Sequence, residues 1–226
     1  MYAENGFNCG DIGKVKNLGN LQLTTGKAAM DSIQKAVSKE LNRNQKVVSL
    51  GGDHSITFPI IQAYSQSYPD LNILHIDAHP DLYDNFENNP YSHASPFARI
   101  MEKGLVNRLV QVGIRTLNDH QKEQVNRFGV EVIEMKDFDP TVSFQFGGPV
   151  YISIDMDALD PAFAPGVSHH EPGGLSTREV INIIHQLNGN VVGGDIVEYN
   201  PDRDINEMTA MVGSKLLKEL MGKILK

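Results

Sequence analysis

Residues 73–81 read Ile-Leu-His-Ile-Asp-Ala-His-Pro-Asp, an apolar run that is followed at once by acids and histidines. A second stretch of the same kind, residues 150–157, reads Val-Tyr-Ile-Ser-Ile-Asp-Met-Asp. Each apolar run is typical of a β-strand, and residues two apart on an extended backbone point the same way. Carboxylates gathered on one side repel one another unless cations lie between them. The two stretches therefore predict strands that end at a metal site, most simply one with two metals.

Apolar runs alternate with helical patterns along the rest of the chain. Ser176 and Glu179 form a capping box at the start of one predicted helix, and Gly129 closes another. The predicted strands are residues 47–50, 73–76, 109–114, 130–135, 150–154 and 191–197, and the helical patterns occupy 29–41, 60–64, 118–128, 180–187 and 208–224. This alternation predicts an α/β fold, a single domain over residues 1–226 with a mostly parallel sheet between two helical layers. Residues 47–50 are expected to be buried, as are Met208 and Met211.

Ligand sites in such sheets lie beyond the carboxyl ends of the strands, and the polar residues of interest all follow apolar runs. These residues are His54, Asp77, His79, Asp81, Asp155, Asp157 and Glu198. Segments that are far apart in the sequence can thus meet in one crevice. The alternative is a set of solvated polar groups that merely end their strands.

Composition limits the classes of partner. The 226 residues carry a net charge of −8, with a pI near 5.4, which argues against a nucleic-acid or anionic-membrane surface. The single cysteine, Cys9, excludes an intramolecular disulfide. No secretory signal and no apolar stretch of transmembrane length is evident, so a cytoplasmic protein is expected.

The predicted ligands are carboxylates with some imidazole, a set that suits Mn²⁺ or a similar divalent ion. Four aspartates balance the charge of two dications, and two histidines complete the set. Two ions about 3.5–4 Å apart can share a water and lower its pKa toward about 7, which gives hydroxide at neutral pH. Hydrolysis is the reaction class that this chemistry favours.

Four blocks of sequence together resemble the ureohydrolases, the family of arginases and agmatinases. The blocks are Gly-Gly-Asp-His-Ser (51–55), Asp-Ala-His-Pro-Asp (77–81), Ser-Ile-Asp-Met-Asp-Ala-Leu-Asp-Pro (153–161) and Asp-Ile-Val-Glu-Tyr-Asn-Pro (195–201). The resemblance runs from about Gly10 to the C-terminus, and residues 81–93 and 165–174 look most like plant-type arginases and their bacterial relatives. It implies the arginase-like fold and a homo-oligomer, since trimers and hexamers are common in the family.

The resemblance also implies a role for each matching residue. Two Mn²⁺ ions per subunit would be bound by His54, Asp77, His79, Asp81, Asp155 and Asp157. A hydroxide between the ions would attack the guanidinium carbon of the substrate and release urea and an amine. Glu198 would hold the guanidinium group, His93 would protonate the departing amine, and His169 would lie near the substrate head. Plainer interpretations are a packing role for His93, a structural ion pair for Glu198 and a core position for His75.

The chain departs from the family at two points. It begins almost at Asp11, whereas family members usually have a strand before that region, so part of the pocket wall is in doubt. Animal-type arginases have an Asn where this chain has Tyr83, but plant-type arginases lack that Asn too. L-arginine, which gives ornithine, is therefore favoured, with agmatine and guanidinobutyrate as alternatives. Arg99 and Arg115 are candidate partners for a substrate carboxylate. A non-enzymatic alternative is an inactive, metal-stabilised homologue with a role in binding or subunit interaction.

Overall fold

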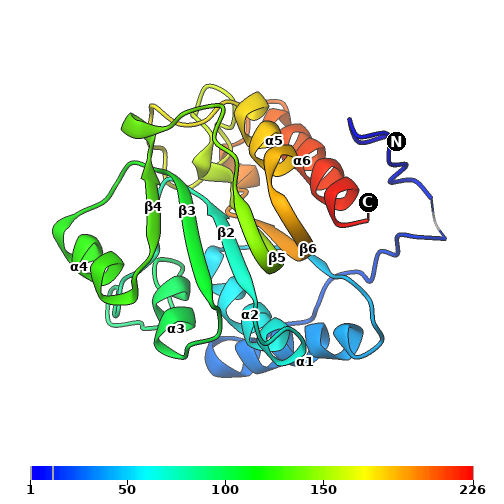
Figure 1. The fold of residues 1–226 in the computed structure, drawn as a ribbon, viewed down its shortest axis with the longest axis horizontal. Helices are drawn as coiled ribbons and strands as arrows, with labels where there is room; N and C mark the ends of the chain where they lie inside the picture. Colours follow the sequence, from blue (N-terminus) through cyan, green and yellow to red (C-terminus); the bar gives the residue numbers. More distant parts are fainter. Residues whose placement is uncertain (1, 12, 226) are drawn as a thin grey trace.

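A parallel six-stranded sheet forms the middle layer of the computed structural model, which describes residues 2–11 and 13–225. The strands lie in the order β1-β6-β5-β2-β3-β4, and every neighbouring pair is parallel (Figure 1). Their bounds are β1 Val48–Leu50, β2 Asn72–Ile76, β3 Arg108–Ile114, β4 Glu131–Glu134, β5 Gln145–Asp155 and β6 Asn188–Val197. The predicted α/β fold with a parallel sheet is confirmed.

Helices cover both faces of the sheet, as Figure 1 shows. On one face lie α1 Gly26–Leu41, α2 Thr57–Ser67, α3 Pro96–Glu102 and α4 Asp119–Phe128, and on the other lie α5 Thr177–Gln186 and α6 Met208–Ile224. Each helical layer buries its own apolar core against the sheet. Strand residues such as Leu74 and Ile152 pack toward α5 and α6, whereas Ile73 and Tyr151 pack toward the other helices, as the two-residue period of a strand requires.

Capping explains where two of the helices begin and end. Asn118 accepts a hydrogen bond from the Gln121 amide at the start of α4, and Gly129, with a φ of 64°, ends that helix in the left-handed conformation. Ser176 and Glu179 form the predicted capping box at the start of α5. Sequence patterns did not indicate α3, a short helix that starts at a proline.

Two predictions about burial are wrong. Within the described residues, strand β1 pairs with β6 alone and forms an edge of the sheet, so its last residue, Leu50, is 65% exposed. Met208 and Met211 at the start of α6 are 49% and 69% exposed. Met211 precedes the buried Leu220 by two and a half helical turns, which places the two residues on opposite sides of α6.

The N-terminal segment lies beside α6 before it descends to α1 (Figure 1). The Asn5 side chain donates to the Gly222 carbonyl at 2.8 Å, and the Glu4 amide donates to the buried Glu219 carboxylate at 3.1 Å. Arg178 of α5 pairs with the Glu4 carboxylate at 2.7 Å. These contacts fasten residues 2–11 to the layer formed by α5 and α6.

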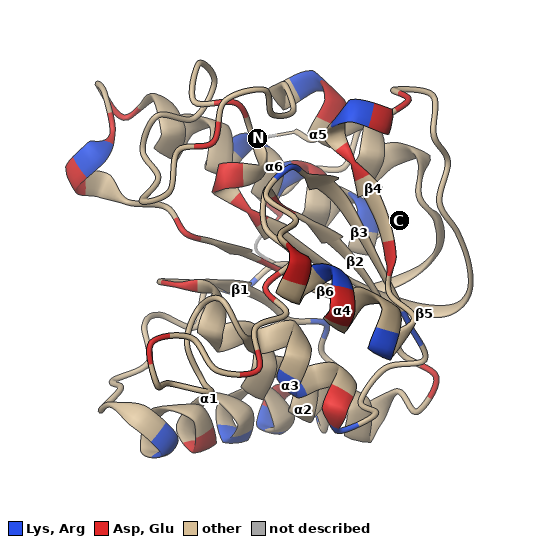
Figure 2. Cartoon of the chain, turned by 90° about the vertical axis from the view of Figure 1, so that its left-hand side faces the viewer, with Lys and Arg blue, Asp and Glu red and all other residues tan. Residues whose placement is uncertain are grey.

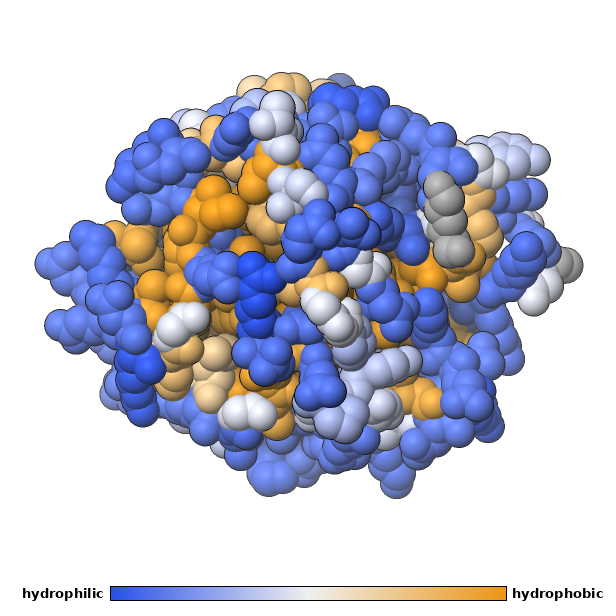
Figure 3. Space-filling view, viewed as in Figure 1, coloured by the Kyte–Doolittle hydropathy of each residue, from blue (hydrophilic) through white to orange (hydrophobic). Residues whose placement is uncertain are grey.

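The surface carries charges of both signs. Figure 2 shows basic and acidic segments interspersed, and α1 alone bears Lys27, Asp31, Lys35, Lys39 and Glu40. In the space-filling view, hydrophobic residues are visible mainly between the two helical layers, where the sheet runs (Figure 3). Among the helices of the described residues, none has both the length and the apolar character needed to cross a bilayer.

Candidate metal centre

The predicted ligands meet at the carboxyl ends of four adjacent strands. His54 begins a short 3-10 helix after β1, Asp77 follows β2, and Asp155 ends β5. Glu198 directly follows β6, which lies between β1 and β5 in the sheet. Because all these strands are parallel, segments more than 100 residues apart in the sequence meet at one edge of the sheet, where ligand sites in α/β folds occur.

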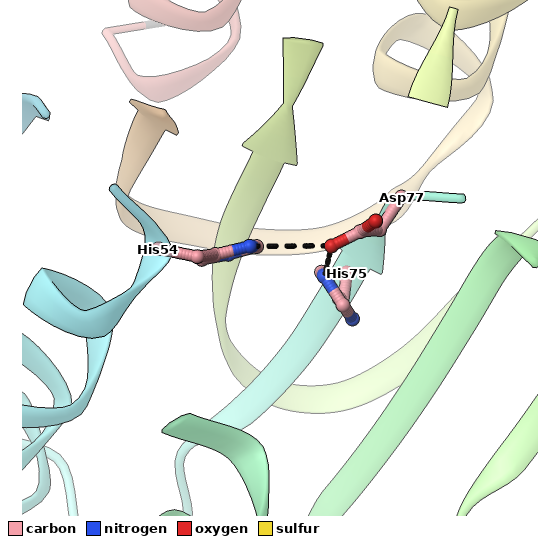
Figure 4. A group of neighbouring side chains, drawn as sticks. All are labelled: His54, His75 and Asp77. Carbon is pink, nitrogen blue, oxygen red and sulfur yellow. Dashed lines mark hydrogen bonds and ion pairs between the residues drawn. The ribbon is translucent and has the colours of Figure 1, made fainter. Parts of the chain in front are cut away.

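Three carboxylate oxygens surround one nitrogen of His54. The Nδ1 atom of His54 lies 3.2 Å from Oδ2 of Asp77, 3.2 Å from Oδ2 of Asp81 and 3.1 Å from Oδ2 of Asp155. All four side chains are buried. Figure 4 shows the His54 ring directed at the Asp77 carboxylate. These four groups form the first half of the site.

The second half of the site is built around His79, which is half-buried. Its Nδ1 atom lies 3.1 Å from Oδ2 of Asp157 and 3.5 Å from Oδ1 of Asp77. Asp77 therefore turns one oxygen toward each half, and its Oδ1 also accepts the backbone amide of His79 at 2.6 Å. Asp155 Oδ1 accepts the amide of Asp157 at 2.7 Å, which ties the two acids of β5 together.

A chain of buried hydrogen bonds fixes the tautomer of His54. Ser153 donates its hydroxyl proton to Asp195 at 2.7 Å, so its oxygen accepts from Nε2 of His54 at 2.9 Å. Asp195 also accepts from Thr57 and Tyr151, at 2.8 and 2.9 Å. With its proton on Nε2, a neutral His54 presents the lone pair of Nδ1 to the three carboxylates.

This arrangement fits a bound cation. Nδ1 of His54 is buried and makes no hydrogen bond among the described residues, although three carboxylate oxygens lie within 3.2 Å. A lone pair that faces three anionic oxygens is repulsive unless a positive charge lies among them. Oxygen and imidazole donors at these spacings are ligands that Mn²⁺ accepts, and Asp77, His79 and Asp157 also lie within metal-binding reach of one another.

Burial and neighbouring charges shift the pKa values of the site in different directions. Burial, with Asp77 adding to it, raises the pKa of Asp81 to about 7. Burial also raises the pKa of Asp155 well above its usual range, and the charges of Asp157 and Asp77 add to the rise. Burial would lower the pKa of His54, but the attraction of the three facing carboxylates outweighs it and raises that pKa. Without metal, the cluster therefore retains protons near neutral pH.

We expect manganese binding to strengthen as the pH rises from about 5 to about 8, because metal must displace these protons. The folded-state pKa of Asp81, about 7, lies above its ordinary 3.8. Its protonated form therefore stabilises the metal-free fold at low pH, and that contribution is lost as the pH rises through about 7. Calorimetric titrations with Mn²⁺ at several pH values would check this. Affinity that is independent of pH would contradict it.

Two residues of the site have a left-handed backbone. Asp81 has a φ of 50° and Glu198 a φ of 64°, values that cost free energy for residues other than glycine. Asp81 is held by its carbonyl, which accepts the Phe97 amide, and Glu198 by its amide, which donates to the Gly52 carbonyl. The left-handed backbone at each residue sets the direction in which its carboxylate leaves the chain.

Glu198 lies beside the first half of the site. Its Oε1 atom accepts the backbone amide of His54 at 2.9 Å, and burial raises its pKa. One carboxylate oxygen is thus fixed, which leaves the other to receive a ligand. The side chain is half-buried, so it borders the site rather than lying behind it.

His93 and His169 lie at the mouth of the site. Their rings stack at a centroid distance of 5.3 Å, and the His169 ring is 6.1 Å from that of His79. His93 is half-buried beneath the edge of Phe86, whereas His169 is exposed. The structure therefore places both predicted histidines next to the second half of the site.

Arg99 and Arg115 are not available to a substrate carboxylate, which corrects the interpretation of their sequence positions. Arg99 is buried and donates to the carbonyls of Asp84 and Pro90, at 2.7 and 3.1 Å. Arg115 donates hydrogen bonds to the carbonyls of five residues, among them Asp157 at 2.8 Å. These residues lie on strand β3, on the segment that follows β5 and in the loop before α5. Both arginines hold loops of the site in place.

Sequence analysis missed several residues behind the ligands. Gln111 was not assigned a place around the site, and Ser153 was seen only as part of a block. Gln111 and Ser153 share one signal, since each is a polar residue in the middle of an otherwise apolar strand. Such residues are buried only where hydrogen bonds satisfy them, so they point to partners at the centre of the fold.

Comparison with known proteins identifies similar chains. The model of the arginase family matches residues 4–222. "Arginase 1, mitochondrial" of Oryza sativa subsp. indica is 58% identical over 186 residues, which cover 78% of this chain and 55% of that protein. An agmatinase of Bacillus cereus is 34% identical over 92% of this chain and 74% of its own length. The solved arginase from Medicago truncatula superposes with a TM-score of 0.94 at 46% identity, over 99% of this chain and 76% of that one.

These matches correct one expectation from the sequence. The chain spans about 55% of the length of the rice relative and 54% of the length of a further relative from Arabidopsis thaliana, which is also 58% identical. Both relatives are named as mitochondrial proteins. These names contradict the expected cytoplasmic location, which rested on the lack of a recognisable signal in this sequence.

Proposed function

The chain belongs to the arginase family, and from that premise we propose that it hydrolyses a linear guanidino substrate, L-arginine, to urea and ornithine. The observation that carries the proposal is the meeting of four carboxylates and two imidazoles beside Glu198 at the ends of β1, β2, β5 and β6. The plant relatives that the chain resembles are named arginases.

We assign two Mn²⁺ ions to this site. The first half, His54 with Asp77, Asp81 and Asp155, and the second half, His79 with Asp77 and Asp157, would hold one ion each. Support comes from a solved neighbour at 31% identity, a triple mutant of the T. brucei arginase-like protein that was solved with Mn²⁺ bound. Such a metal pair supplies a nucleophile from water at neutral pH.

Glu198 is the residue to which we assign guanidinium binding. A planar cation and a carboxylate can form two parallel hydrogen bonds, which fixes the orientation of the substrate. One Glu198 oxygen is held by the His54 amide, so the carboxylate plane is set before the substrate arrives. Pre-set geometry of this kind lowers the entropic cost of reaching the reactive arrangement.

His93 is the residue to which we assign proton transfer to the departing amine. An imidazole can both accept and donate a proton and suits this task. The Phe86 ring, at 5.7 Å, and the His169 ring, at 5.3 Å, hold it on two sides. The loop that carries it is fastened by Arg99, which donates to carbonyls of the same loop.

The carboxylate of an arginine substrate can pair with a cation at the mouth, and Arg203 can offer one. It is exposed and donates from Nη1 to the Ser168 carbonyl at 3.1 Å, next to His169. Its Nε and Nη2 groups make no hydrogen bond within the described part of the chain, so they can receive a carboxylate. Tyr83 instead hydrogen-bonds Asn118 at 2.5 Å, at the start of α4.

Replacing Arg203 by glutamine should raise KM for L-arginine roughly tenfold, the equivalent of about 1.4 kcal/mol, with little change in kcat. Agmatine lacks the carboxylate, so its KM should stay the same. Steady-state assays of urea release from both substrates would measure this, with Arg43→Gln on the far side of the fold as the control. Equal changes for both substrates would show that Arg203 does not recognise the carboxylate.

The test of the proposed function is urea release from L-arginine, agmatine and guanidinobutyrate in the presence of Mn²⁺. Preferential release from agmatine would identify an agmatinase, which the Bacillus cereus relative makes the second candidate. No release from any of them, by folded protein that holds manganese, would favour the inactive homologue. The trimeric or hexameric assembly stays a prediction, which light scattering can check.

A further inference from the structure

A row of buried hydrogen bonds runs behind Asp77, the carboxylate shared by both halves of the site. Nε2 of His75 lies 2.7 Å from Oδ2 of Asp77, and Nδ1 of His75 lies 3.0 Å from Nε2 of Gln111. His75 is on β2 and Gln111 is opposite it on β3, where the two residues are paired in register. All three side chains are fully buried, and Figure 4 shows His75 directed at Asp77.

The backbone of Pro80 fixes the orientation of the Gln111 amide. The Pro80 carbonyl lies 2.7 Å from Nε2 of Gln111, and a carbonyl can only accept, so the amide nitrogen must face it. The same nitrogen uses its other proton for Nδ1 of His75, while Oε1 of Gln111 has no partner among the described residues. Nδ1 of His75 is therefore an acceptor.

It follows that His75 carries its proton on Nε2 and donates it to Asp77. A nitrogen that holds a proton has no lone pair for a metal, although His54, His75 and Asp77 lie close enough to form a ligand group. The ring of His75 cannot turn freely, because Phe97 stacks on it at a centroid distance of 3.9 Å. His75 is thus a satisfied core histidine, as the sequence indicated.

We propose that Gln111 and His75 are positioning residues that set the metal affinity of the site by fixing the Asp77 carboxylate. Gln111 selects the tautomer of His75, and the His75 N–H occupies one lone pair of Asp77 Oδ2. The remaining lone pair then faces the space beside Nδ1 of His54. The inference rests on the proposed metal centre and is independent of whether the protein hydrolyses arginine.

Replacing Gln111 by leucine should weaken Mn²⁺ binding about 10–100-fold, the usual cost of losing a hydrogen bond that orients a metal ligand. Free Mn²⁺ would be measured by electron paramagnetic resonance during titration of the purified chain. The control is Gln124→Leu on α4, which also removes a buried glutamine but one that contacts Arg127 rather than the site. Unchanged affinity in Gln111→Leu would overturn the proposal.

The tautomer of His75 can be measured in the wild-type protein, so this test does not depend on whether a variant folds. ¹⁵N-labelled histidine spectra should show the His75 proton on Nε2, both in metal-free protein and after addition of diamagnetic Zn²⁺. A proton on Nδ1 would overturn the role of Gln111, and loss of the Nε2 proton on Zn²⁺ addition would make His75 a ligand. Wild-type protein that binds no Mn²⁺ would overturn the metal centre and, with it, the proposed function.

Discussion

Replacing Asp77 by alanine should abolish turnover and leave at most one of the two proposed metals bound. Asp77 turns one oxygen to each half of the site, so its loss removes a ligand from both. Metal ions contribute several kcal/mol of transition-state stabilisation, which corresponds to a fall in kcat/KM of roughly 10³-fold or more. Elemental analysis of the purified variant and urea assays at saturating Mn²⁺ would measure both effects.

Asp84→Ala is the matched control for this experiment. Asp84 is exposed, follows Asp81 by three residues and faces His120 at 3.4 Å instead of the site. The metal-free Asp77→Ala protein should melt below metal-free wild type, because the loss of the carboxylate leaves the buried N–H of His75 without an acceptor. Two bound metals together with activity within a few-fold of wild type would refute the ligand assignment.

Removal of the metals should lower the melting temperature of the wild-type protein by roughly 8–16 °C for each ion lost. Ligand at about 1,000 times its Kd stabilises a fold by about 4 kcal/mol. A domain of about this size shifts by roughly 2–4 °C per kcal/mol. Calorimetric scans with excess Mn²⁺ and with a chelator would measure the difference, and the shift should be smaller in Asp77→Ala. Equal melting temperatures in the two wild-type scans would mean that the carboxylates do not share a cation.

Much of the fold and of the ligand positions followed from local patterns. The run before Asp77 and that before Asp155 are strands, because short apolar runs that end in polar residues fit a buried parallel sheet. The site could be located because parallel strands end at one edge. Strand order could not be derived in this way, so the edge position of β1 and the exposure of Leu50 were missed.

The hydrogen-bond partners of individual side chains could not be predicted from the sequence either. Arg99 and Arg115 were candidate partners for a substrate carboxylate, since charge type and position are all that a sequence displays. In the fold both guanidinium groups donate hydrogen bonds to backbone carbonyls, and these contacts depend on the conformations of the loops. The same holds for Gln111, whose importance lies in which atom of its amide faces Pro80.

The pairing of β1 with β6 has a consequence for how the protein is made. Val48 lies opposite Gly194, so within the described residues the strand that leads to His54 pairs with a strand from near the C-terminal end of the sequence. A strand edge that stays unpaired during folding can pair wrongly with other chains. Pairing over such sequence separations is also slow, because long loops must close first. Manganese uptake during refolding should therefore be a late event, and its time course would report when the last strand joins the sheet.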